Sequence, residues 1–167
     1  IMRLGDHFQQ IKKKYHNTFF SGICFDHRKI KKNYIFFAIK GNNLDGNNFI
    51  PSVIKKGCKI IVTEKNFDEW KNGVLFINTK NIRKLLAQIS FSIFKKKPNN
   101  LIAVTGTNGK SSVSDFYYQI LRLNNKKVAS IGTLGVRSNN FNLNLLNTTI
   151  DPIYLGKILN ELKKRKI

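Results

Sequence analysis

The stretch Leu101–Ser112, L-I-A-V-T-G-T-N-G-K-S-S, joins an apolar run to two glycines, a lysine and hydroxyl side chains. Because glycine lacks a Cβ, the backbone at Gly106 and Gly109 can turn tightly and aim successive N–H groups at one anion. Lys110 adds a positive charge. The Ser111 hydroxyl falls in the first turn of the expected helix, where it can hold Mg²⁺ beside a phosphate. This spacing indicates binding of nucleotide phosphates.

The loop is a short form of the common phosphate loop G-x-x-x-x-G-K-[ST], because Val104 stands where the first glycine of that pattern would fall. Its context matches, since an apolar strand precedes it and an amphipathic helix follows it. The apolar stripe of that helix is Val113, Phe116, Tyr117, Ile120 and Leu121. The alternative is an ordinary glycine-rich turn with a solvated lysine. The position of Gly-Lys-Ser favours phosphate binding.

Length and composition limit the class of protein. With 167 residues and 41% hydrophobic content, the chain can form one ordinary domain or two small ones. It contains no run of about 18 apolar residues, and its start does not resemble a signal peptide, so we expect a cytoplasmic protein without membrane insertion. Cys24 and Cys58 lack C-x-x-C spacing, which favours buried reduced thiols over a disulfide or a metal site.

The formal net charge of +21 would ordinarily suggest nucleic acid or an anionic membrane as a partner. The lysines, however, occur in short clusters at the ends of expected elements, and no aromatic-and-basic stacking motif accompanies them. We therefore expect no nucleic-acid partner. A phosphate-loop module that acts on nucleic acid is kept as an alternative.

The first part of the chain alternates strand and helix patterns. Aromatic and β-branched residues predict strands over 19–26, 34–39, 59–63 and 74–78. Helical spacing predicts a short helix that ends near Gly57 and a longer one over 82–93. The run K-K-K-P-N-N at 95–100 has the composition of an exposed connection, so we place a domain boundary there.

The second part begins with the strand 101–105, the loop and its helix, followed by a strand over 128–131. Alternation of strand and helix predicts that these two strands join one parallel sheet. Asp151-Pro152 then predicts the start of a final helix. The expected fold class is α/β. Because such sheets usually have about five strands, we expect this part to be the start of a larger domain.

The assembled motifs resemble the Mur ligase family, and within it the MurE type. Residues 25–51, F-D-H-R-K-I-K-K-N-Y-I-F-F-A-I-K-G-N-N-L-D-G-N-N-F-I-P, are similar to the family segment D-S-R-x-V-x-x-G-D-L-F-V-A-L-x-G-x-x-x-D-G-x-x-F-I-P. V-T-G-T-N-G-K-S-S is similar to its ATP loop. I-G-T-L-G-V and L-N-T-T-I-D-P are similar to its G-T-x-G and N-T-T-P-D segments.

The resemblance implies a fold and an activity. Residues 1–96 would form a UDP-MurNAc-binding domain, and residues 97–167 would begin the central ATP-binding domain. The whole protein would be an ATP- and Mg²⁺-dependent ligase of peptidoglycan precursor synthesis. It would add meso-diaminopimelate or L-lysine to UDP-MurNAc-L-Ala-D-Glu through an acyl phosphate. The family's remaining metal ligand and carbamylated lysine would lie beyond residue 167, so we expect no turnover by this chain alone.

The resemblance also implies site residues. Lys110 and Ser111 would act on the reacting phosphate, with Ser111 on Mg²⁺. The residues that hold ATP would be Gly106, Thr107, Asn108, Gly109, Lys110, Ser111 and Ser112. Those that contact the UDP-MurNAc-peptide would be Phe25, His27, Asn42, Asn43, Leu44, Asn147, Thr148 and Thr149. His27 stands where the family usually has serine, and Ile150 where it usually has proline.

Other interpretations stay open at this point. A MurF-type ligase typically reads T-G-S-x-G-K-T-T in the loop, whereas Thr107 and Asn108 fit the MurE type. A regulatory nucleotide-binding protein would keep the loop without the peptide substrate. Without the resemblance, composition favours a turn for the Asn-rich run 42–48, and residues 147–149 could equally be a helix-capping stretch before Asp151.

Overall fold

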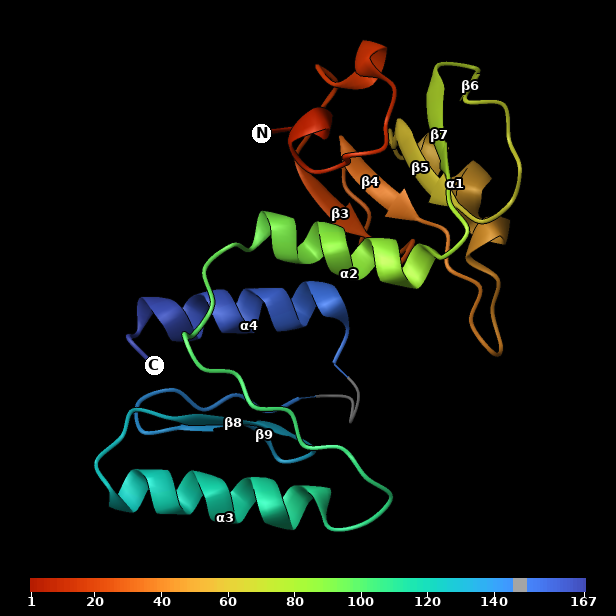
Figure 1. The fold of residues 1–167 in the computed structure, drawn as a ribbon. Coiled ribbons are helices and arrows are strands. Elements are labelled where there is room, and N and C mark those ends of the chain that lie inside the picture. Colours follow the sequence, from red (N-terminus) through yellow and green to blue (C-terminus); the bar gives the residue numbers. More distant parts are fainter. Residues whose placement is uncertain (146–149) are drawn as a thin grey trace. The chain divides into compact units, whose positions relative to one another are not determined.

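The computed structural model describes residues 1–145 and 150–167, which form two compact units, Ile1–Ile93 and Phe94–Ile167 (Figure 1). A five-stranded sheet is the centre of the first unit, and a two-stranded hairpin is the centre of the second. Within the described ranges, no helix combines the length and the apolar character needed to cross a bilayer. The fold is a mixed α/β fold with a parallel-rich sheet.

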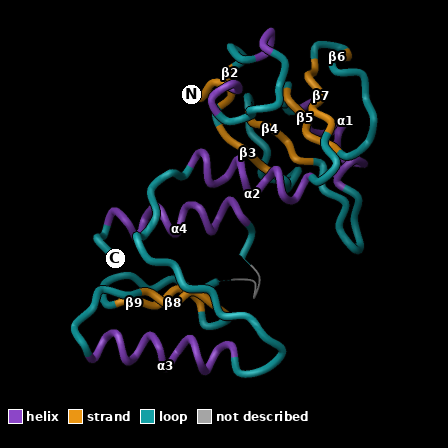
Figure 2. Tube along the Cα trace, in the orientation of Figure 1, coloured by secondary structure: helices purple, strands orange, loops and turns teal. Residues whose placement is uncertain are grey.

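The sheet of the first unit has the strand order β3 (Gly22–Cys24), β4 (Tyr34–Phe37), β5 (Ile60–Thr63), β7 (Val74–Asn78) and β6 (Trp70–Lys71) (Figure 2). The first four strands are parallel, and β6 pairs antiparallel with β7. The strands predicted over 34–39, 59–63 and 74–78 are confirmed, with ends shifted by at most two residues. The short β6 was not predicted.

One face of this sheet packs against the short helix α1 (Ile50–Lys55). Side chains alternate between the two faces of a strand, so Phe36, Ile61 and Phe76 share a face. They form a buried cluster with Ile50 and Val53 of the helix. α1 is followed by Lys56 and then by Gly57, whose φ of +85° is readily adopted by glycine.

The opposite face carries the other alternate residues. Ile35 and Val62 are fully buried there, and the buried side chains of α2 (Ile82–Ile93) include Leu86 and Ile89. α1 and α2 lie on different sides of the sheet in Figure 1. The helix predicted over 82–93 is confirmed at both ends, because its 3.6-residue apolar period matches one buried face.

The predicted strand over 19–26 is divided in the structure. β2 (Phe19–Phe20) pairs antiparallel with β1 (Met2–Arg3), whereas β3 joins the parallel sheet. Ser21 lies between them, and its N–H donates to the carbonyl oxygen of Asn33 at 2.8 Å. The continuous aromatic and β-branched pattern therefore spans two short strands that belong to different sheets.

Both cysteines of the first unit are buried thiols, as the sequence predicted. The Cys58 thiol donates to the carbonyl oxygens of Tyr34 and Ile60, each at 3.2 Å. Burial raises the pKa of the Cys58 thiol above its usual value. Its neutral form is therefore favoured at physiological pH.

In the second unit, the antiparallel hairpin of β8 (Ala129–Gly132) and β9 (Gly135–Ser138) lies between the helices α3 (Lys110–Leu123) and α4 (Pro152–Lys164) (Figure 1). The predicted final helix is confirmed. Asp151 caps it, accepting a hydrogen bond from the Tyr154 N–H at 2.9 Å. Its apolar stripe packs on the hairpin, where Val136, Ile158, Leu159 and Leu162 form a buried cluster.

The predicted parallel sheet of the second unit is not present in the described residues. Residues 101–105 are exposed and form no strand, and β8 pairs antiparallel with β9. Only Thr133 and Leu134 separate β8 from β9, so they close as a hairpin. Leu143 then bridges to Val136. An extended segment needs a neighbouring strand to satisfy its backbone groups, and the structure pairs no strand with 101–105.

The predicted stripe on α3 is also oriented differently from the expectation. Val113, Phe116 and Ile120 are exposed, with Phe116 63% exposed, whereas Tyr118 is buried. The polar side of the helix faces the hairpin: Asp115 pairs with Arg137 at 2.7 Å, and the Arg137 guanidinium lies over the Tyr118 ring. This narrow hairpin packs against α4, and it offers α3 no broad apolar face.

Candidate functional site

The carboxyl ends of the parallel strands in the first unit share one edge of the sheet, which is where open α/β sheets bind ligands. Phe25 and His27 follow directly after β3, and Asn42–Leu44 lie in the loop after β4. β3 and β4 are neighbours in the sheet. The structure therefore brings these predicted contact residues to the same edge.

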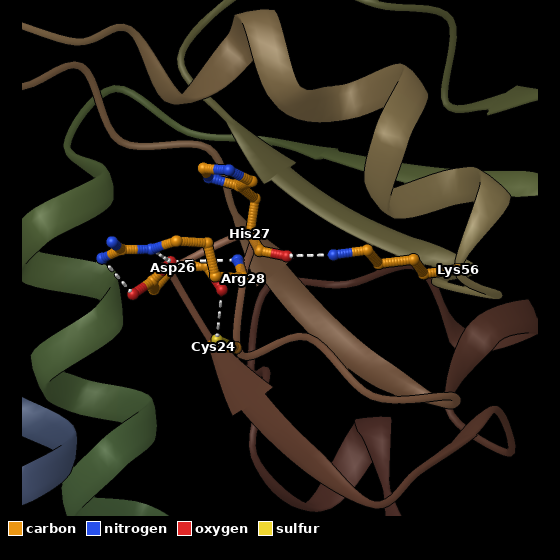
Figure 3. A network of polar contacts seen from close by, with 5 residues as sticks. All are labelled: Cys24, Asp26, His27, Arg28 and Lys56. Atoms are coloured by element: carbon orange, nitrogen blue, oxygen red, sulfur yellow. Dashed lines mark hydrogen bonds and ion pairs between the residues drawn. The ribbon is translucent and has the colours of Figure 1, made fainter.

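The turn after β3 is held by Asp26 (Figure 3). Its carboxylate accepts hydrogen bonds from the Arg28 backbone N–H at 3.0 Å and from Nε and Nη2 of the Arg28 side chain, both at 2.9 Å. The Arg28 guanidinium lowers the pKa of Asp26 to about 2. The carbonyl oxygen of Asp26 also accepts a bond from the Cys24 thiol at 3.0 Å. This turn is thus held by hydrogen bonds to Cys24 before it and to Arg28 after it.

His27 is the central residue of that turn, and its ring points away from the Asp26–Arg28 pair in Figure 3. The imidazole stacks on the Phe49 ring, with 3.8 Å between the centroids and 5° between the planes. Lys56 Nζ donates to the His27 carbonyl oxygen at 3.0 Å. His27 therefore forms a half-buried aromatic pair at a position where the family usually has serine.

The loop after β4 is a tight turn. The Gly41 N–H donates to the Leu44 carbonyl oxygen at 2.8 Å, and Lys40 bridges to Asp45. Asn42, Asn43 and Leu44 are exposed, Leu44 to 66%. Two amides and one apolar side chain at the edge of the sheet suit a planar polar ring such as a base.

Below this loop lies a polar network that the sequence reading missed. Asn47 donates to the Asp45 carboxylate at 2.7 Å and accepts from the Thr63 hydroxyl at 2.7 Å. Thr63 is fully buried at the end of β5. The hydrogen bonds from Asn47, first from its backbone N–H, lower the pKa of Asp45. The D-G pair signalled only a turn, and nothing in the spacing indicated a partner on β5.

The phosphate loop of the second unit has the backbone that its glycines predict. Gly106 has φ of +149° and Gly109 has φ of +73°, conformations that L-residues with a side chain rarely adopt. α3 begins at Lys110 directly after Gly109, without a side-chain cap. The N–H groups of the first turn are therefore available to an anion.

The functional side chains of the loop lie at this helix start. Lys110 Nζ donates to the carbonyl oxygens of Gly106 at 2.5 Å and Thr107 at 3.1 Å. Thr107, Asn108, Ser111 and Ser112 are exposed beside it. An ammonium, three hydroxyls and uncapped N–H groups fit a nucleotide phosphate. Ser111 offers Mg²⁺ one neutral oxygen, and no group of three or more His, Cys, Asp or Glu side chains converges in residues 1–145 and 150–167.

The remaining predicted contacts, Asn147, Thr148 and Thr149, lie outside the described residues. The two candidate regions belong to different units, the sheet edge to Ile1–Ile93 and the loop to Phe94–Ile167.

Two family models match this chain. The model described as "Mur ligase family, catalytic domain" matches residues 20–93, and the one described as "Mur ligase middle domain" matches residues 104–167. The first range contains the sheet-edge residues after β3 and β4, and the second contains the phosphate loop.

Curated relatives extend these matches. A protein of Rickettsia felis named UDP-N-acetylmuramoyl-L-alanyl-D-glutamate–2,6-diaminopimelate ligase is 39% identical over 160 residues, 91% of this chain and 29% of that protein. A protein of the same name from Fusobacterium nucleatum is 36% identical over 151 residues, 89% of this chain and 30% of that protein. The chain thus spans about a third of the length of these relatives.

This chain also matches a solved structure of a protein with the same name. The match covers 98% of this chain and 34% of the chain in that structure, with a TM-score of 0.77 and 21% sequence identity. At that identity, the likeness shows the fold.

Proposed function

Because the chain belongs to the Mur ligase family, we propose that it supplies the uridine-binding domain and the ATP loop of a cytoplasmic ligase that adds the third amino acid to UDP-MurNAc-L-Ala-D-Glu. In this proposal, residues 1–96 bind the UDP-MurNAc end and residues 97–167 begin the ATP-binding domain. The names of the relatives support diaminopimelate rather than lysine as the added amino acid.

The observation that carries the proposal is the backbone of the loop. Left-handed Gly109 directly precedes the uncapped start of α3 at Lys110. A phosphate placed there meets N–H donors, the positive end of a helix dipole and an ammonium together. A merely structural turn would need none of the three.

The proposed reaction brings two anionic groups together. A D-Glu carboxylate must attack the γ-phosphate of ATP, although both are anionic, to give an acyl phosphate and ADP. The incoming amine then attacks the acyl carbon, forms the amide bond, loses a proton and releases inorganic phosphate. Lys110 and the N–H groups of the loop neutralise the phosphate oxygens and hold them in line for attack. The Ser111 hydroxyl is positioned to be one ligand of Mg²⁺, which neutralises further phosphate charge when bound.

The edge of the first unit binds the other end of the substrate in this proposal. Phe25 and Leu44 are exposed apolar side chains on neighbouring loops, and they provide contacts for the faces of the uracil ring. Asn42 and Asn43 carry the donors and acceptors that match the ring's polar edge. His27, supported by Phe49, replaces the hydroxyl that other family members place there.

Calorimetry on the 167-residue chain tests both halves separately. We expect Mg-ATP to bind, and Lys110→Ala to weaken that binding at least tenfold. UDP-MurNAc-L-Ala-D-Glu should bind the wild type and Lys110→Ala equally, because its uridine site is in the other unit. Absence of heat with both ligands, from protein with native circular dichroism, would remove the basis of the proposal.

A further inference from the structure

A cavity of about 100 Å³ lies at the end of the first-unit sheet where β4 and β5 begin, opposite to the candidate uridine site. Its lining includes Phe19, Tyr34, Lys59, Ile60, Trp70 and Leu75. We propose that this cavity is the anchor pocket of a docking surface for an acidic polypeptide segment. That segment inserts one branched aliphatic side chain into the pocket.

The size and chemistry of the cavity argue for an apolar anchor. Its floor is the buried pair Ile60 and Leu75. A cavity of about 150 Å³ with an apolar lining admits benzene, so this smaller one suits a leucine or isoleucine side chain. Burial of such a side chain contributes to association because its apolar surface leaves water.

The rim of the cavity has the composition of a protein interface. Phe19 is 59% exposed and Trp70 is 56% exposed, although large aromatic side chains gain from burial. The Trp70 indole is stacked on the Tyr15 ring, with 6.2 Å between the centroids and 8° between the planes. Aromatic side chains that are held in place before binding are typical of interface hot spots.

Charge selects the partner. The lining contains Lys59 and no carboxylate, and Lys59 makes none of the ion pairs found among residues 1–145 and 150–167. The nearest acidic neighbour in sequence to Trp70 is Glu69, which already pairs with Lys12 at 2.9 Å and Lys14 at 3.5 Å. The surface therefore has positive charge to offer and little negative charge. An acidic segment complements it, whereas a second copy of this chain, at +21, would be repelled.

The chain contains a single tryptophan, so Trp70 reports directly on this pocket. The probe is a Trp-free acidic peptide, Asp-Glu-Asp-Leu-Glu-Asp with blocked ends, titrated into the 167-residue chain. The control peptide has alanine in place of leucine. We expect a saturable change in Trp70 emission with the leucine peptide and at least tenfold weaker binding of the alanine peptide.

Variants separate the pocket from the general positive charge. Lys59→Gln should lower the affinity for the leucine peptide at least threefold. Lys80→Gln removes an equal charge from the other end of the sheet and should leave this affinity unchanged. Phe19→Ala, an exposed position, should weaken binding with the protein still folded. Equal binding of both peptides, equal effects of the two lysine variants, or no change in Trp70 emission would each overturn the proposal. None of these outcomes depends on nucleotide or UDP-substrate binding.

Discussion

Lys110 donates from its Nζ to the carbonyl oxygen of Gly106, 2.5 Å away, so the ammonium closes the loop that would hold a phosphate. A bound triphosphate competes with this carbonyl for the same charge. We predict that Mg-ATP moves Lys110 off the loop carbonyls, with large NMR shifts at Gly106 and Thr107. Lys110→Ala should lower nucleotide affinity at least tenfold and change stability by no more than about 0.5 kcal/mol, because the side chain is exposed. A large loss of stability would instead give Lys110 a structural role.

Gly46→Ala should destabilise the first unit. A Cβ there would lie 2.6 Å from the Ile39 carbonyl oxygen and 2.7 Å from the Ile39 nitrogen, and both are backbone atoms that cannot move aside easily. We expect a cost of about 3 kcal/mol and a melting temperature lower by about 10 °C or more. Gly41→Ala is the matched control, since its Cβ would meet only the Leu44 carbonyl oxygen at 3.2 Å. Similar melting temperatures for the two variants would contradict this steric account.

Thr63→Val should break the polar network beneath the loop after β4. The Thr63 hydroxyl donates to the Asn47 side-chain oxygen at 2.7 Å and accepts from the Lys65 N–H at 3.1 Å. Valine keeps the volume but removes both bonds, at a cost of about 1–3 kcal/mol in urea unfolding. Thr63→Ser keeps the hydroxyl and should recover most of the loss. If serine and valine destabilise equally, packing rather than hydrogen bonding accounts for this position.

The Asp26 carboxylate, in the turn after β3, should become protonated only at an unusually low pH. The pKa of Asp26 is about 2 in the folded chain, against about 3.9 for a free side chain, because the Arg28 guanidinium binds the carboxylate. A folded pKa below the unfolded one gives stabilisation that is complete above about pH 4 and is lost as the pH falls towards 2. Carboxyl NMR should show a titration midpoint near pH 2 for Asp26. Arg28→Ala should move it back towards 3.9, and an unmoved midpoint would exclude the guanidinium as its cause.

The sequence predicted elements well where local pattern and packing agree. The stripe of α2 satisfies the helical period, and its residues Leu86 and Ile89 are buried in the structure. The Asp151 side chain caps α4 as the local rule for helix starts predicts. Pairing in the second unit could not be predicted in this way. The two-residue turn at Thr133–Leu134 lets β8 close on β9. Periodicity does not say which neighbour a strand selects, and it places the stripe of α3 without saying what covers it.

The candidate site was also predictable only in part from the sequence. The glycines and Gly-Lys-Ser predicted the backbone turn of the candidate phosphate loop, because that motif is contiguous and its backbone geometry depends on residue type. The contacts beneath the loop after β4 were not visible in the sequence. His27 meets Phe49 and Asn47 meets Thr63 only after α1 and β5 are packed against the sheet. Contacts of that kind depend on distances between elements, which spacing along the chain does not give.

The most direct test of the proposed function is turnover by a chimera. The segment of the Rickettsia felis relative that matches this chain would be replaced by residues 1–167, and phosphate release would be measured with ATP, UDP-MurNAc-L-Ala-D-Glu and diaminopimelate. We predict product that requires all three substrates, with the rate lowered about 10²- to 10³-fold by Lys110→Ala. A folded chimera that binds both nucleotides but forms no amide, or one unaffected by Lys110→Ala, would contradict the account.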